Sequence, residues 1–101
     1  MQELANALAT VFGSARAETW VRLRSLPPEN YAENGEEDPL GAEAIFVSIT
    51  KRDLPSASLL ANEATAVASV VATVCQRSME RVHVIYEPPG RHRIALGGRL
   101  I

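Results

Sequence analysis

Arginine is the residue type that offers the most chemistry in this sequence. It supplies nine of the ten basic residues, and its planar guanidinium group binds a carboxylate through two parallel hydrogen bonds and stays charged when partly buried. Arg52 follows an apolar stretch, and Arg91 and Arg93 flank His92 near the end of the chain. Arginine side chains are therefore the candidates for binding an anion, and ordinary solvated surface charge is the alternative.

Two other side chains offer chemistry, each with a structural alternative. His83 falls in a stretch of alternating apolar residues, where a histidine can titrate near neutral pH or serve as a fixed hydrogen-bond donor. Cys75 is the single cysteine and lies in an apolar, helix-like stretch, so no disulfide can form within the chain. We interpret Cys75 as a small buried hydrophobe.

Length and charge restrict the class of protein. A chain of 101 residues suits one domain with a single core. Ten basic residues against twelve acidic ones give a formal net charge of −2, which disfavours nucleic acid and anionic membranes as partners. No run of about 18 apolar residues occurs, and the first residues lack the pattern of a secretory signal. We expect a cytoplasmic protein, and we expect neither a cofactor nor a metal.

The elements that must position these side chains begin with two predicted helices. Between Met1 and Phe12, apolar residues recur at helical spacing, and Gly13 can end that helix. A longer helix is predicted from Ser56 to Cys75, rich in alanine and valine and preceded by Pro55. A helix of this kind packs one face on a sheet.

Three strands are predicted from alternation and β-branched residues. They are Thr19–Arg24, with Val21 and Leu23 on one face, then Ala44–Thr50, and finally Val82–Tyr86. The intervening segment 25–43 carries three prolines, two glycines and an acidic run, which predicts a surface loop.

The sequence repeats itself at an offset of 63 residues. Val21 corresponds to Val84, and Gly35 corresponds to Gly98. The second half, 44–101, contains a complete strand, helix and strand, which is a β-α-β unit. The first half, 1–35, contains only part of a helix and the last strand, and 36–43 is the linker between the halves. We therefore predict one domain of tandem β-α-β units, a mixed α/β sheet with two helices on one face, in which the first strand is missing.

Three features resemble the tautomerase superfamily: the doubled β-α-β pattern, the segment VHVIYEPP, and the glycine-ended segments YAENG and IALGG. The likeness is nearest to the longer members, in which two β-α-β units are fused and three chains form a trimer. The resemblance implies interconversion of keto and enol forms of small carboxylic acids, with an amino-terminal proline as general base. A terminal amine has a pKa of about 7.7–8, which suits proton transfer at neutral pH. This sequence begins with Met1 and Gln2 instead.

The resemblance also implies sites on this chain. Arg52, Arg91 and Arg93 would bind the substrate carboxylate, with Tyr31 as a pocket wall that packs or donates a hydrogen bond. The homotrimer interface would contain Trp20, Arg22, Arg24, Phe46, His83 and Glu87. Solvated turns, a charged surface hairpin and an exposed sheet face are the respective alternatives.

Three functional hypotheses follow. The chain is an isomerase whose polypeptide begins upstream with a proline, or a non-catalytic subunit that binds a carboxylate, or an enzyme that recruits His83 or Glu87 as its base. In the related fold the missing strand lies between Thr19–Arg24 and Ala44–Thr50. We expect upstream residues or a neighbouring subunit to fill that place, and direct hydrogen bonding between these two strands would contradict the expected sheet order.

Overall fold

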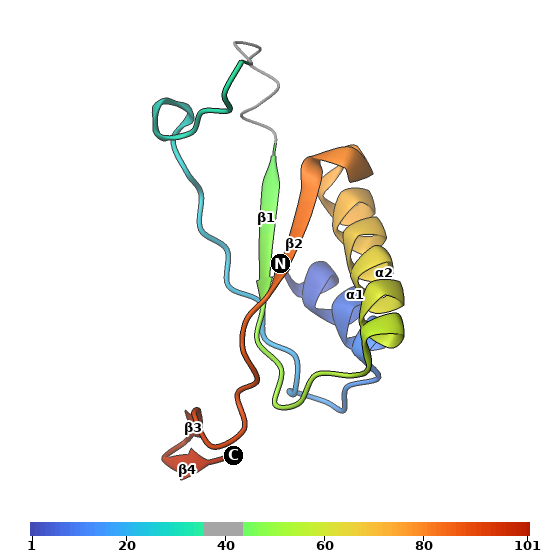
Figure 1. Ribbon diagram of the computed structural model, residues 1–101, viewed down its shortest axis with the longest axis vertical. Coiled ribbons are helices and arrows are strands. Elements are labelled where there is room, and N and C mark those ends of the chain that lie inside the picture. The colour runs from blue at the N-terminus through green and yellow to red at the C-terminus, as the bar shows by residue number, and fades with distance from the viewer. Residues whose placement is uncertain (36–43) are drawn as a thin grey trace.

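A parallel pair of strands joined by a helix forms the centre of this protein. The structure is a computed structural model in which residues 1–35 and 44–101 are described. Strand β1 (Ile45–Ile49) pairs in parallel with β2 (Val82–Tyr86), with Ile45 opposite Val82 and Ile49 opposite Tyr86. Helix α2 (Ala57–Cys75) makes the crossover between them (Figure 1). The strand, helix and strand predicted between residues 44 and 86 are confirmed within one residue of their expected bounds.

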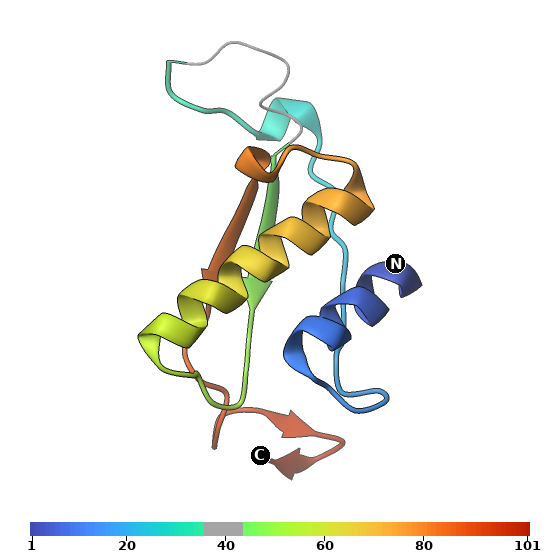
Figure 2. The same ribbon diagram turned by 90° about the vertical axis from the view of Figure 1, so that its right-hand side faces the viewer.

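Helix α1 (Gln2–Phe12) confirms the first predicted helix, and Gly13 ends it with φ of 64°, the left-handed conformation that glycine adopts readily. Figure 2 shows α1 beside α2, and both helices lie on one side of the sheet. Leu4 and Leu8 of α1 are buried in one core with Val67 and Val71 of α2. The apolar stripe of each helix therefore faces the other helix and the strands.

The predicted strand Thr19–Arg24 is not a strand in this structure. Among the described residues β1 pairs with β2 alone, and no backbone hydrogen bond joins β1 to residues 19–24. Val21 packs against the core, whereas Leu23 is 75% exposed. An alternating sequence becomes a strand only where a neighbour accepts and donates its backbone hydrogen bonds. The direct pairing that would have contradicted the expected sheet order is absent from the described part of the chain.

The two strands of a short hairpin near the end of the chain were not predicted, although a charged surface hairpin was the alternative given for this segment. Strand β3 (Ala95–Leu96) pairs with β4 (Arg99–Leu100) in antiparallel fashion. Gly97 and Gly98 form the connection with φ of 58° and 84°, and two positive φ angles in succession are typical of a tight hairpin turn. Figure 1 places this hairpin beyond the end of the sheet, away from α1 and α2.

In the described part of the chain, two short 3₁₀ helices lie near the amino ends of β1 and β2. They are η1 (Pro28–Asn30) and η3 (Met79–Arg81), and an ion pair of 2.9 Å between Arg81 and Glu33 joins the two regions. Of the predicted loop 25–43, residues 36–43 lie outside the described residues. The assignment of residues 1–35 to a first repeat unit remains a prediction.

By length and composition alone, α2 would be able to span a membrane, a criterion that core helices of globular proteins also meet. Four of its residues are buried in the core of this chain, namely Val67, Ala68, Val71 and Ala72.

Candidate functional site

A pocket at the carboxyl end of β1 gathers polar and charged side chains from three parts of the chain. It has a volume of about 480 Å³ and is open to solvent. Its lining consists of Arg22, Ser48, Thr50, Glu87, Pro88, Gly90, Arg93 and Ile94. Arg22 comes from the extended segment after α1, Ser48 and Thr50 from β1 and its end, and the rest from the segment after β2. The carboxyl ends of parallel strands often form ligand sites, because the loops that follow the strands meet there.

The charges of this pocket favour an anion. Arg22 has no ion-pair partner among residues 1–35 and 44–101, and Arg93 donates one long bond of 3.4 Å to the carbonyl of Pro89. Among the described residues, Glu87 is the single acidic side chain in the lining. The hydroxyl groups of Ser48 and Thr50 add neutral donors beside the two guanidinium groups. Two arginines against one glutamate leave the pocket with an excess positive charge.

Gly90 fixes the shape of the pocket on the side of the last segment. Its amide donates to the carbonyl of Lys51 over 2.7 Å, and the residue is buried. A Cβ atom at position 90 would lie 2.6 Å from Cδ1 of Ile94 and 3.4 Å from that carbonyl. Glycine at this position therefore allows the Ile94 side chain to lie against the backbone while it lines the pocket.

The structure does not bring the predicted substrate residues together. Arg93 lines the pocket, but Arg91 is bound to Asp53 through two hydrogen bonds of 2.6 Å. That bidentate bond lowers the pKa of Asp53 and raises the pKa of Arg91. Both side chains are exposed, at 43% and 55%, so their ion pair adds little to stability. Arg52 is exposed and does not line the pocket.

Tyr31 lies near the other end of β1. Its hydroxyl donates to Glu33 over 2.5 Å, and its ring centroid is 6.0 Å from that of Phe46. The hydrogen bond to Glu33 raises the pKa of Tyr31, and bonds from Tyr31 and then Arg81 lower the pKa of Glu33. Tyr31 therefore packs and donates a hydrogen bond, but it does so away from the arginine pocket.

Of the residues predicted for a subunit interface, Phe46 and His83 lie on the sheet face that the helices leave uncovered, whereas Trp20 lines a pocket beside α1. Phe46 is 56% exposed and stacks obliquely on His83, with ring centroids 5.2 Å apart. Trp20 is 69% exposed and donates from Nε1 to the carbonyl of Ala17. Arg22 and Glu87 lie in the pocket instead, and Arg24 is exposed.

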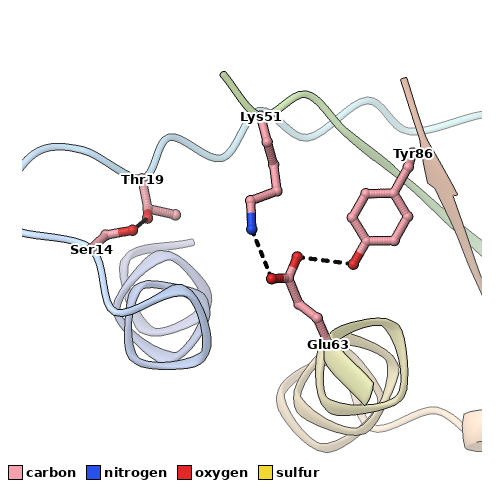
Figure 3. A network of polar contacts seen from close by, with 5 residues as sticks. All are labelled: Ser14, Thr19, Lys51, Glu63 and Tyr86. Carbon is pink, nitrogen blue, oxygen red and sulfur yellow. Dashed lines mark hydrogen bonds and ion pairs between the residues drawn. The ribbon is translucent and has the colours of Figure 1, made fainter. Parts of the chain in front are cut away.

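A polar network on the helix side was missed by the sequence reasoning. Lys51 Nζ lies 2.7 Å from Glu63 Oε2, and the hydroxyl of Tyr86 donates to Glu63 Oε1 over 3.0 Å. Figure 3 shows this carboxylate on α2 held between the two side chains, beside a separate bond from Thr19 to Ser14. The sequence offered one signal that could have indicated this network, namely that Lys51 is the only lysine of the chain.

A larger open pocket, of about 680 Å³, lies between α1 and residues 14–21, and Arg16 is the only charged side chain among its described lining residues. Within residues 1–35 and 44–101, no three histidine, cysteine, aspartate or glutamate side chains gather to hold a metal ion. The smaller pocket at the end of β1 is therefore the stronger candidate on chemical grounds.

Comparison with known proteins gives no relative: no family model, no curated protein and no solved structure matches this chain.

Proposed function

We propose that this chain binds a small carboxylic acid in the pocket at the carboxyl end of β1, as a distant relative of the tautomerase superfamily. The observation that carries the proposal is the presence of Arg22 and Arg93 in one pocket with no acidic partner for either among the described ion pairs. Guanidinium groups in that position bind a carboxylate by donating charge-assisted hydrogen bonds to its oxygens. Ser48 and Thr50 supply further donors to its oxygens.

The proposed ligand class is the unsaturated keto or enol acid, such as a phenylpyruvate-like or muconate-like compound. Glu87 is the side chain in the pocket that can accept a proton, so it is the candidate base. The pocket is open to water, which weakens electrostatic stabilisation of an enolate. We therefore expect measurable binding of the acid and slow turnover. A non-catalytic subunit that binds a carboxylate is the second candidate function.

Binding is tested by titrating phenylpyruvate into the protein and following heat or amide chemical shifts. Arg22→Ala and Arg93→Ala should each weaken the complex by about 1.5–3 kcal/mol, the range for hydrogen bonds to charged groups. Arg91→Ala is the matched control, because Arg91 is engaged with Asp53 and does not line the pocket. Arg52→Ala should likewise leave the affinity unchanged. Equal affinity in all four variants would remove the pocket from consideration.

Turnover is tested by following enol-to-keto conversion of phenylpyruvate. A rate far below the usual enzyme median of about 10 per second is expected. Glu87→Gln keeps the shape of the side chain and removes its basicity, so it should abolish whatever conversion remains. Conversion that persists in Glu87→Gln would exclude Glu87 as the base, and fast conversion would exclude the non-catalytic candidate.

We further propose that the chain assembles as a homotrimer through the uncovered sheet face. Exposed Phe46 and Ile85 support this proposal, because a face that carries large apolar side chains is a common interaction surface. Sedimentation at micromolar concentration should give a species three times 10.9 kDa in mass. Phe46→Asp should dissociate it, whereas Leu59→Asp, on the exposed side of α2, should not. A monomer in the unaltered protein would contradict the proposal.

A further inference from the structure

The outer edge of β1 presents unpaired backbone groups. The carbonyls of Ile49 and Lys51 accept hydrogen bonds from Glu87 and Gly90, on the β2 side. Along a strand, the backbone groups of successive residues point to opposite edges. The amides and carbonyls of Phe46, Ser48 and Thr50 therefore point to the other edge, where no described residue bonds to them.

An extended segment flanks this edge without pairing to it. Residues 19–26 run alongside β1 in the opposite direction, and their backbone makes no backbone hydrogen bond within the described chain (Figure 1). Figure 2 shows α1 in front of this segment, on the helix side of the sheet, and Val21 packs against the same core as Leu4 and Leu8. Residues 19–26 therefore lie along the outer edge of β1, and α1 covers this region on the helix side of the sheet.

The pocket described above is the end of this edge. Ser48 and Thr50 belong to both, and Arg22 of the flanking segment lines the pocket from the other side. The outer edge of β2 is also unpaired in the described residues, but no residue of β2 itself lines the pocket, whereas Ser48 of β1 does. The pocket therefore continues the β1 edge, and its positive charge indicates what can occupy that edge.

We propose that an extended acidic peptide adds to β1 as a third strand, with its carboxylate in the pocket between Arg22 and Arg93. Main-chain bonds to Phe46, Ser48 and Thr50 would give affinity, as in other cases of strand addition. The two guanidinium groups would select the acidic end. The inference deepens the proposed function and rests on it: the carboxylate of the ligand is carried by an extended polypeptide.

The test uses blocked hexapeptides of alternating threonine and valine with one glutamate. One peptide carries the glutamate at its amino end and the other at its carboxyl end, because either strand direction can bring the acid to the pocket. Binding of one of them to the full chain is expected, with slower amide exchange at Phe46, Ser48 and Thr50. Replacing its glutamate with glutamine should weaken binding by roughly tenfold or more, and so should N-methylation of its inward-facing amides.

A protein variant tests the edge directly. Ser48→Pro removes an outward amide while leaving the β1–β2 hydrogen bonds in place, and proline is tolerated at such edge positions. It should abolish peptide binding, whereas Ser48→Ala, which removes one hydroxyl donor of the pocket and keeps the outward amide, should weaken binding only in part. The N-methylated peptide gives the same information without altering the protein.

The outcomes separate this inference from the proposed function. Binding of phenylpyruvate without binding of either peptide would overturn the inference and leave the proposed function intact. Peptide binding that does not depend on Arg22 or Arg93 would overturn the placement of the peptide carboxylate in the pocket. It would also overturn the placement of the small acid there. Protection of Phe46, Ser48 and Thr50 in the free protein, lost on dilution, would show that a second copy of the chain occupies the edge and would also overturn the inference.

Discussion

Lys51 Nζ lies 2.7 Å from Glu63 Oε2, and this contact joins the residues after β1 to α2. Both side chains are largely buried, at 25% and 15% exposure. The ammonium group also lies 5.2 Å from the ring centroid of Phe12, within the range of a cation–π contact. One lysine therefore connects β1, α1 and α2, and Tyr86 adds β2 through the same carboxylate.

Removing this carboxylate should destabilise the protein. In Glu63→Ala, Lys51 and Tyr86 both lose their partner while remaining largely covered, so the free energy of unfolding should fall by about 1.5–3 kcal/mol. Urea denaturation measures the change. Asp53→Ala is the matched control, because it breaks an exposed ion pair and should cost much less. A cost at Asp53 equal to that at Glu63 would show that burial does not govern these pairs.

Tyr86 predicts a pH dependence in the alkaline range. Burial, followed by the bond to Glu63, raises the pKa of Tyr86 from 10.0 to about 12. The folded state holds the proton more tightly than the unfolded state, so this contribution to stability is complete below pH 10 and is lost as pH rises toward 12.

The free energy of unfolding of the unaltered protein should therefore fall relative to that of Tyr86→Phe between these pH values. Denaturation at a series of pH values makes the comparison. Parallel profiles for the two proteins would contradict the raised pKa.

The ends of the two helices form a matched pair for backbone strain. Gln76 ends α2 with φ of 54°, and Gly13 ends α1 with φ of 64°. A side chain in this left-handed region costs about 1 kcal/mol. Gln76→Gly should raise the melting temperature and Gly13→Ala should lower it, each by the equivalent of about 1 kcal/mol. No atom lies near a Cβ at Gly13, so a steric contact cannot produce the loss. Changes of the same sign in both variants would exclude this explanation.

Gly90→Ala should alter the pocket by displacing one side chain. The new Cβ would meet Cδ1 of Ile94 at 2.6 Å, which forces Ile94 to move at a cost of about 1–3 kcal/mol. Affinity for phenylpyruvate should fall as well, since Ile94 lines the pocket. Adding Ile94→Val removes Cδ1 and should restore part of both losses. If the double variant is no better than Gly90→Ala, contact with Ile94 is not the cause.

The helices and the paired strands could be predicted because their signals are local. Apolar spacing and a terminal glycine defined α1, and β-branched alternation defined β1 and β2. Thr19–Arg24 has the same alternation but finds no backbone partner, and a strand depends on that partner. The strands of the hairpin around Gly97 and Gly98 were not predicted, because they contain only two residues each.

The candidate site was less predictable, because ion pairs depend on distances that sequence does not contain. Arg93 was expected to bind an anion and does line the pocket, whereas Arg91, two positions earlier, is bound to Asp53. Arg22 was expected at an interface and lies in the pocket instead. The loop after β2 decides whether Arg91 or Arg93 lines the pocket. Backbone hydrogen bonds to the carbonyls of Lys51 and Arg52 hold that loop in place.

The crossover through α2 also determines the order in which this chain can fold. β1 and β2 are neighbours in the sheet, but a helix of 19 residues and its two connections separate them in sequence. Closing so long a loop costs entropy before any hydrogen bond between the strands forms. The β3–β4 hairpin closes across two glycines, and hairpins form within about 1–10 μs. The parallel sheet therefore forms late, and until it does, β1 and β2 are both unpaired apolar strands. Aggregation during synthesis or refolding should compete with that step.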